Sequence, residues 1–326
     1  MAAALGEFWF WRGYLGEGRR WVEEALAKSG RTPTAARARA LRWLSWLAAE
    51  LGDLERAEEA GEEGLGLEGV ELLRTGSGDS IAAHLQRALG MVLARRGEPE
   101  RATELLEESL RLSRKAGSER GAARAIYSLA NICVLEGDYE RATQLFEEAL
   151  TMIRETGDPA RFAIALIDQT ELFLRQGDLE RATAASEEAA ALLRELKHRC
   201  ALASALYTLG WAVLLQGDSE RARDLYVESL RLSREVDNKP LITDTLQALA
   251  SAATARREAE RAARLFGAVE ISNEAAGSLQ DAVEEARVEP YLMAARSQLG
   301  ETAWQETWAE GRAMTLEEAI SYALEE

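Results

Sequence analysis

The segment Gly137-Asp138-Tyr139-Glu140-Arg141-Ala142 decides the fold, because close copies of it recur along the chain. Every copy ends in Glu-Arg-Ala, and a last copy at residues 257–262 has lost its glycine. The copies that keep it begin at Gly52, Gly97, Gly137, Gly177 and Gly217. The first step is 45 residues (97−52), and each later step, up to residue 257, is 40 residues (137−97 and so on). Such regular spacing indicates an array of repeated structural units.

The motif predicts a turn followed by the start of a helix. Glycine adopts the left-handed conformation that ends a helix without steric cost. The aspartate beside it can accept backbone N–H bonds and cap the next helix, and the glutamate places negative charge near the positive end of that helix. The small alanine suits a close crossing of two helices. We therefore expect an all-α, right-handed solenoid (superhelix) of about seven helix–turn–helix units.

Composition supports this fold and excludes several functions. Hydrophobic residues make up 47 % of the 326 residues, mostly Ala and Leu, with five prolines, which favours helix over sheet. The 39 basic and 56 acidic residues give a net charge of −17, which disfavours direct binding of nucleic acid or an anionic membrane. The two cysteines lack paired spacing, and no apolar run is long enough for a membrane span. A cytoplasmic protein is predicted.

These units resemble the tetratricopeptide repeat (TPR) family. The Leu-Gly pair of the family's first helix falls at residues 5–6, 89–90 and 209–210, and the large residue of the second helix falls at Leu106, Phe146, Tyr226 and Phe266. The likeness covers residues 1–277 as a TPR-like repeat array. Its units lie near residues 2–36, 38–78, 83–118, 123–158, 163–198, 203–238 and 243–277.

The pattern changes from Gln280 onward. Three further helices are predicted at residues 281–299, 301–312 and 315–324, and Thr315 with Glu318 matches the capping-box pattern. Because a repeat array needs a terminal piece over its last apolar face, we interpret residues 278–326 as a C-terminal helical cap. Trp304, Trp308 and Tyr322 suit that role.

The tail also resembles the end of the repeat domains of large signal-transduction ATPases, which include LuxR-type, MalT-like and SARP-type bacterial transcriptional regulators. Residues 265–268 (Leu-Phe-Gly-Ala), 308–312 (Trp-Ala-Glu-Gly-Arg) and 316–319 (Leu-Glu-Glu-Ala) carry this likeness. In that group the repeats form a sensor or regulatory arm behind an ATPase module. The chain has no G-x-x-x-x-G-K-[ST] loop of its own, so the resemblance implies an upstream ATPase domain.

The resemblance implies a ligand groove on the concave face, lined by the first helix of each unit. The family's groove positions fall in this chain at Arg39, Arg42, Trp43, Trp46, Glu50, His84, Arg87, Met91, Arg95, Arg124, Tyr127, Asn131, Asp168, Glu171, Tyr207 and Trp211. Arginine supplies bidentate donors, and Tyr or Trp supplies apolar area at low entropy cost, as recognition surfaces require. The alternative is that the tryptophans pack on the neighbouring helix and that the arginines pair with nearby glutamates.

An aromatic cluster opens the chain. Phe8, Phe10 and Trp11, together with Trp9, put bulky apolar groups on more than one side of the first helix. A helix that is apolar all round is normally buried. We interpret these residues as a docking patch for an upstream domain or a second copy of the chain, with core packing as the alternative.

Other motifs do not support catalysis. Residues 64–69 match G-x-G-x-x-G, but that loop works between a strand and a helix, and here it follows a helix. His84 and His198 lie in different units without ligand spacing, and Cys133 falls at a core position. No catalytic residue, metal or cofactor is expected. The predicted function is non-catalytic recognition of a protein, peptide or small inducer by the regulatory arm of an ATP-dependent regulator. A free-standing adaptor is the alternative.

Overall fold

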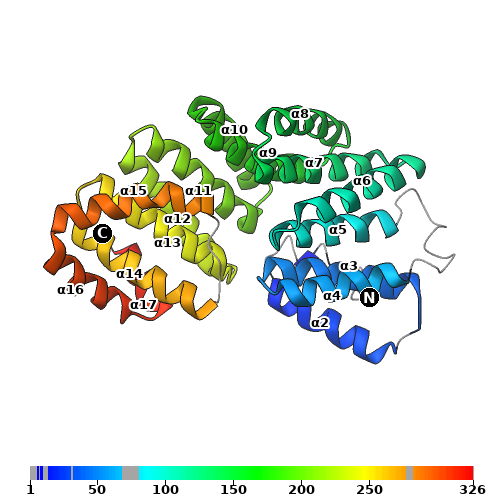
Figure 1. Ribbon diagram of the computed structural model, residues 1–326, viewed down its shortest axis with the longest axis horizontal. Coiled ribbons are helices and arrows are strands. Elements are labelled where there is room, and N and C mark those ends of the chain that lie inside the picture. Colours follow the sequence, from blue (N-terminus) through cyan, green and yellow to red (C-terminus); the bar gives the residue numbers. More distant parts are fainter. Residues whose placement is uncertain are drawn as a thin grey trace. The chain divides into compact units, whose positions relative to one another are not determined.

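The computed structural model describes residues 6, 8, 9, 14–30, 32–67, 81–276 and 282–325. Over these residues the chain is α-helical, with short turns and no strand (Figure 1). The helices there are α2 (Leu15–Lys28), α3 (Ala35–Glu50), α4 (Leu54–Gly66), α5 (Ile81–Arg95), α6 (Pro99–Lys115), α7 (Glu119–Glu136), α8 (Tyr139–Glu155), α9 (Pro159–Gln176), α10 (Leu179–Glu195), α11 (Arg199–Leu215), α12 (Ser219–Glu235), α13 (Lys239–Ala255), α14 (Ala259–Ala276), α15 (Ala282–Leu299), α16 (Glu301–Arg312) and α17 (Leu316–Leu324).

The chain forms two compact units, Met1–Leu172 and Phe173–Glu326, which we call unit 1 and unit 2. In unit 1, α2 packs on α3, and the hairpins α3/α4, α5/α6 and α7/α8 follow in chain order. The first helices also contact one another in succession, α3 with α5 and α5 with α7. In unit 2, α10 packs on α11, and the hairpins α11/α12 and α13/α14 follow, with α11 in contact with α13. This stacking confirms the predicted all-α solenoid.

The turns inside the hairpins have the predicted conformation. Gly52 and Gly137 have φ of +82° and +79°, in the left-handed region. Each following aspartate caps the next helix, as where the Asp138 carboxylate accepts a bond from the backbone N–H of Arg141 at 3.1 Å. The second copy departs from this pattern, because Glu98 makes no side-chain cap bond and Pro99 begins α6 instead.

A second capped turn recurs between the hairpins, and the sequence interpretation did not include it. Ser118 and Asn238 cap α7 and α13 with their side chains. These helices begin at Glu119 and Lys239, four residues before the predicted unit starts at 123 and 243. The cap residue, rather than the first apolar position, therefore sets the start of each first helix.

The predicted Leu-Gly and large-residue pairs meet where the two helices of a hairpin cross. A Cβ on Gly90 would lie 3.0 Å from Leu106, and one on Gly210 would lie 2.3 Å from Tyr226. Leu106 and Tyr226 are fully buried. A Cβ at position 210 would overlap the Tyr226 ring, so this position requires glycine, whereas a Cβ at position 90 would only press on Leu106.

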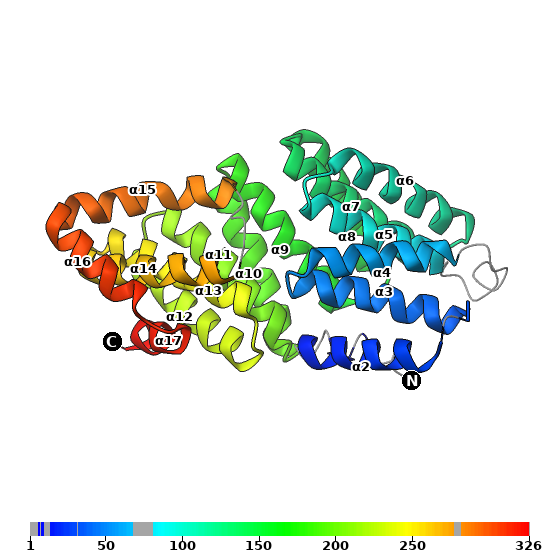
Figure 2. The ribbon, with the colours of Figure 1, turned by 60° about the horizontal axis from the view of Figure 1, so that its bottom comes forward.

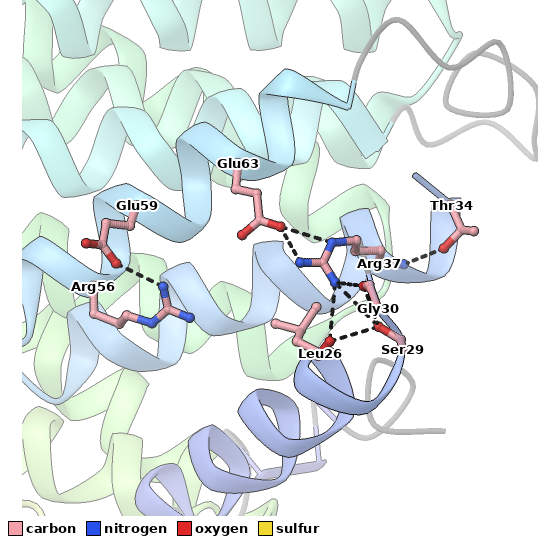
Figure 3. A network of polar contacts seen from close by, with 8 residues as sticks. All are labelled: Leu26, Ser29, Gly30, Thr34, Arg37, Arg56, Glu59 and Glu63. Carbon is pink, nitrogen blue, oxygen red and sulfur yellow. Dashed lines mark hydrogen bonds and ion pairs between the residues drawn. The ribbon is translucent and has the colours of Figure 1, made fainter. Parts of the chain in front are cut away.

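Arg37 of α3 connects α2, α3 and α4 of unit 1 through hydrogen bonds (Figure 3). Its guanidinium donates to the carbonyl oxygen of Leu26, in the last turn of α2, at 3.3 Å and to that of Gly30, just beyond α2, at 2.6 Å. It also donates to Glu63 of α4 at 3.0 Å, while its backbone N–H bonds the Thr34 hydroxyl that caps α3. The Arg37 side chain is 9 % exposed, so this buried arginine is fully engaged.

The tail forms the three predicted helices, α15, α16 and α17. Thr315 and Glu318 make the predicted capping box. Trp304 is buried, and α16 packs against α14, the second helix of the last hairpin. The division into an array at 1–277 and a cap at 278–326 stays a prediction, since α15, α16 and α17 all belong to compact unit 2.

The glycine-rich match and the helix lengths bear on two further functional classes, dinucleotide binding and membrane insertion. The G-x-G-x-x-G match starts at Gly64 inside α4, which ends at Gly66, and its last glycine at residue 69 lies outside the described residues. None of the helices in the described ranges is both long and apolar enough to cross a lipid bilayer.

Candidate ligand-binding face

The predicted groove residues of unit 1 gather on one face. We call this face the unit 1 wall and define it by α3, α5, α7 and the part of α9 up to Leu172. Arg39 and Arg95 are exposed there, Trp43 is buried, and the other predicted members are half-buried, as expected for side chains lining a surface. Those half-buried members are Arg42, Trp46, Glu50, His84, Arg87, Met91, Arg124, Tyr127, Asn131, Asp168 and Glu171.

The middle of the wall is a closed polar network. The Tyr127 hydroxyl donates to the Asp168 carboxylate, and the Asn131 amide donates to the same oxygen at 3.1 Å. Burial raises the pKa of Asp168, and burial together with the Asp168 charge raises the pKa of the Tyr127 hydroxyl. The Tyr127 ring also packs edge-on against Phe146, with centroids 6.0 Å apart. These residues satisfy one another and shape the wall.

Arg95 is paired with α3. Its guanidinium donates to the Glu50 carboxylate at 2.9 Å and to the Ala49 carbonyl at 3.0 Å. Glu50 raises the pKa of Arg95. The alternative reading, in which wall arginines pair with nearby glutamates, holds for this residue.

Two further contacts line the wall. Arg124 Nη1 lies 3.4 Å from His84 Nε2, and a hydrogen bond there requires the imidazole nitrogen to accept from the guanidinium. The Arg42 guanidinium lies 4.5 Å from the centroid of the Trp43 ring, a cation–π distance, and Trp43 packs edge-on against Trp46. Trp43 is buried, so it packs in the core as the alternative held.

Arg87 differs from its neighbours. Among the residues that the structure describes, it makes no ion pair, and its buried Nε has no hydrogen-bond partner. Burial, followed by the charges of Arg161 and Arg42, lowers its pKa to about 10. The strongest charged neighbours of this guanidinium are therefore two more arginines.

The corresponding face of unit 2 is covered, which corrects the predicted placement of Tyr207 and Trp211. Helix α15 packs on α13 and α14 and lies beside α11 (Figure 2). The Tyr207 hydroxyl donates to Glu284 of α15, while Tyr291 and Arg287 of α15 pack at 6.2 and 5.4 Å from the Trp211 ring. Trp211 is fully buried. It cannot touch a ligand while α15 is in place.

The predicted N-terminal docking patch is only partly described. Phe8 is 47 % exposed, whereas Trp9 is buried against Gly18 of α2. Phe10 and Trp11 lie outside the described residues. The patch stays a prediction.

A groove of about 1190 Å³ in unit 2 is rich in arginine, and three of these arginines are engaged with nearby residues. Arg256 pairs with Glu220 at 2.8 Å, and Arg261 donates to the Ala323 carbonyl of α17 at 2.9 Å. Arg264 donates to the Tyr322 hydroxyl at 2.9 Å. We interpret this groove as part of the surface on which the end of α17 docks.

The remaining sequence candidates have structural roles. His198 caps α11, where its Nδ1 accepts from the Ala201 N–H at 3.2 Å. Cys133 is buried in the core of unit 1, as predicted. Arg161 was missed, because the predicted unit starts at 163 whereas α9 begins at Pro159. The cap and proline at 158–159 were the signal for that earlier start.

The chain matches a known family over most of its length. The family described as "MalT-like TPR region" matches residues 83–319. No curated protein sequence matches the chain.

Solved structures share the fold at low identity. BtubC (BKLC) from P. vanneervenii is 24 % identical and has a TM-score of 0.50, with 68 % of this chain and 91 % of that chain covered. A Rap protein complexed with competence and sporulation factor is 14 % identical, covers 87 % and 81 %, and has a TM-score of 0.59. A signal transduction ATPase with numerous domains and a tetratricopeptide repeat sensor, from Pyrococcus horikoshii, is 16 % identical with a TM-score of 0.56. That match covers 85 % of this chain and 43 % of the ATPase.

Proposed function

This chain belongs to the family of MalT-like TPR regions, and from that membership we propose that it is the non-catalytic sensor arm of a larger ATP-dependent signalling or transcriptional regulator. The unit 1 wall receives the ligand, a protein, a peptide or a small inducer. Ligand binding shifts the packing of the stacked hairpins, which restrains or releases an attached ATPase module. Stacked repeats suit this role because each hairpin contacts only its neighbours.

The observation that carries the proposal is the gathering of half-buried polar and aromatic side chains from successive repeats on the unit 1 wall. Such a surface can offer charged donors and flat apolar area together. The Rap protein with the same fold is complexed with competence and sporulation factor, and the Pyrococcus ATPase uses its repeats as a sensor. Both uses are consistent with the proposal.

The test uses the native protein that contains this chain. The proposal expects a P-loop in the same reading frame, and it expects ATP hydrolysis by the full protein to respond to the small-molecule and peptide fraction of the source cells. Arg87→Glu should reduce that response about tenfold, the effect of losing one charge-assisted contact. Arg101→Glu is the matched control, since Arg101 lies on α6, outside the wall, and pairs only with Glu98 nearby.

Two results would count against the sensor arm. A reading frame without a P-loop would favour the free-standing adaptor, which bridges proteins without an ATPase. If ATP hydrolysis responded equally in the Arg87→Glu and Arg101→Glu variants, the unit 1 wall would not be the regulatory site.

A further inference from the structure

Arg87 occupies an unfavourable position in the protein alone. A buried polar group without a partner costs about 1–3 kcal/mol, and more when it is charged. Here the guanidinium Nε is buried and unbonded, and the nearest strong charges, Arg42 and Arg161, repel it. These three residues come from α3, α5 and α9, so the positive charge is assembled from the first helices of three different repeats.

Two other arginines of unit 1, Arg37 and Arg95, differ from Arg87 in their partners. Arg37 reaches two carbonyl oxygens and Glu63, and Arg95 reaches Glu50 and one carbonyl. The chain holds 56 acidic residues against 39 basic ones, so carboxylates are abundant. Nevertheless, none of the described carboxylates forms an ion pair with Arg87. Because the described residues supply no such partner, we look for one in a ligand of the unit 1 wall.

We propose that the unit 1 wall contains an anion-binding site in which Arg87, flanked by Arg42, Arg161 and Arg124, holds a carboxylate or phosphate group of the ligand. The site rests on the proposed function and names the chemistry of its ligand. An anion would satisfy the buried Arg87 guanidinium and relieve its repulsion from Arg42 and Arg161. Arginine suits this role because its planar fork bonds either group through two donors.

The surroundings of Arg87 favour an anion over a cation. Arg124 contacts His84, which lies one helical turn before Arg87 on α5, so a fourth guanidinium borders the site. Tyr127 lies close enough for its charge state to affect Arg87. Its hydroxyl proton is directed at Asp168, so Tyr127 offers Arg87 no hydrogen-bond acceptor in an ion pair. Arg161 pairs with Asp158 at 3.0 Å, whereas none of the described carboxylates pairs with Arg87.

The test measures anion binding by the purified chain with two probes, inorganic phosphate and triglutamate, by calorimetry at constant ionic strength. Arg87→Gln should weaken both probes about tenfold or more, equivalent to about 1.4 kcal/mol per decade, while Arg87→Lys should retain part of the affinity. Arg101→Gln, on α6, should bind as the wild type does.

Thermal unfolding of the same variants separates a binding role from a structural one. Arg87→Gln removes a buried, repelled charge, so its unfolding temperature should equal or exceed that of the wild type. Arg95→Gln breaks the pair with Glu50 and should lower it. A clear loss of stability in Arg87→Gln would indicate a structural arginine and would count against the site.

The two probes identify the source of the anion. Binding of phosphate alone points to a phosphorylated ligand, binding of triglutamate alone points to a carboxylate ligand, and binding of both supports a general anion site. Failure of both probes to saturate the wild type, or equal affinity in Arg87→Gln, overturns the inference. If the chain binds anions but Arg87→Glu does not change ATP hydrolysis by the full protein, the anion site is supported and the proposed function is wrong.

Discussion

Arg257 shows what the hairpin turn demands of its first residue. It occupies the position of the lost sixth glycine and still adopts φ of +66°, as Gly52 and Gly137 do near +80°. A side chain in this left-handed region costs about 1–2 kcal/mol. The turn geometry is therefore imposed by the packing of the two helices, and the sequence of this copy opposes it.

We predict that Arg257→Gly stabilises the protein by about 1 kcal/mol, because it removes this strain at a small entropic cost. Urea unfolding followed by circular dichroism measures the change. Gly217→Ala, at φ of +95° in the preceding copy, is the matched control and should lose a similar amount. A destabilised Arg257→Gly would mean that the arginine makes a compensating contact.

At the residue scale the sequence predicted the local devices well. Glycine turns, aspartate caps and the Thr315 capping box depend on neighbours within a few residues, so they can be read from the chain. The pairings on the unit 1 wall join residues one repeat apart, as Glu50 with Arg95 and Tyr127 with Asp168 do. The repeat length predicts which residues are neighbours. It does not predict the side-chain rotamers, and these place Arg95 in an ion pair but leave Arg87 without one.

At the element scale, α16 shows how closely the tail is joined to the last hairpin. A Cβ on Gly311 would lie 2.0 Å from the Arg264 carbonyl oxygen of α14, and one on Gly267 would lie 2.4 Å from the Trp308 carbonyl oxygen of α16. The obstacles are backbone atoms, which cannot rotate away. Both glycines fall in the segments that carried the likeness to regulator repeat domains, so that likeness has a packing basis.

We predict that Gly311→Ala destabilises the protein by about 3 kcal/mol, because α16 must move away from α14. Urea unfolding monitored by tryptophan fluorescence suits the measurement, since Trp304 and Trp308 lie on α16. Gly16→Ala in α2 is the control, because a Cβ there meets no atom within 4 Å. If Gly311→Ala were as stable as the control, α16 would not be docked as described.

The position of α15 could not be read from the sequence. Its helical range was predicted, but the pattern did not reveal which surface it would cover. Its contacts with Tyr207 and Trp211 are polar and aromatic, and they span 77 residues in the case of Glu284 and Tyr207. No repeat period links α15 to α11, so long-range pairing of this kind leaves no local signal.

At the scale of the whole molecule, the net charge of −17 at pH 7 reflects carboxylates with ordinary pKa values, which are ionised at that pH. The chain has only two histidines, and burial lowers the pKa of His198. Two buried carboxylates are exceptions: Asp168 in unit 1, whose pKa burial raises, and Asp244 in unit 2. Burial, followed by the nearby charge of Glu284 on α15, raises the pKa of Asp244 from 3.8 to about 7.

The pH dependence of stability follows from this shift. Asp244 binds its proton more tightly in the folded state than in the unfolded state. Its contribution to the free energy of unfolding is therefore complete below about pH 4 and is lost as the pH rises through about 7. His198 contributes with the opposite sign, because its folded pKa is lowered and stability grows as the pH rises towards 6.5. The Asp244 shift is the larger, so wild-type stability should fall between about pH 5 and pH 8.

Asp244→Asn isolates this contribution, because asparagine keeps the shape and removes the titration. We predict that the variant is more stable than the wild type at about pH 8, on the order of 2 kcal/mol, and that it loses the fall in stability between about pH 5 and pH 8. Urea unfolding at both pH values measures the two effects. Asp218→Asn is the control, since Asp218 is exposed and caps α12 away from α15, and it should keep the wild-type pH slope. An unchanged slope in Asp244→Asn would show that the covering helix α15 does not bury this carboxyl, and Tyr207 and Trp211 would then become accessible to a ligand after all.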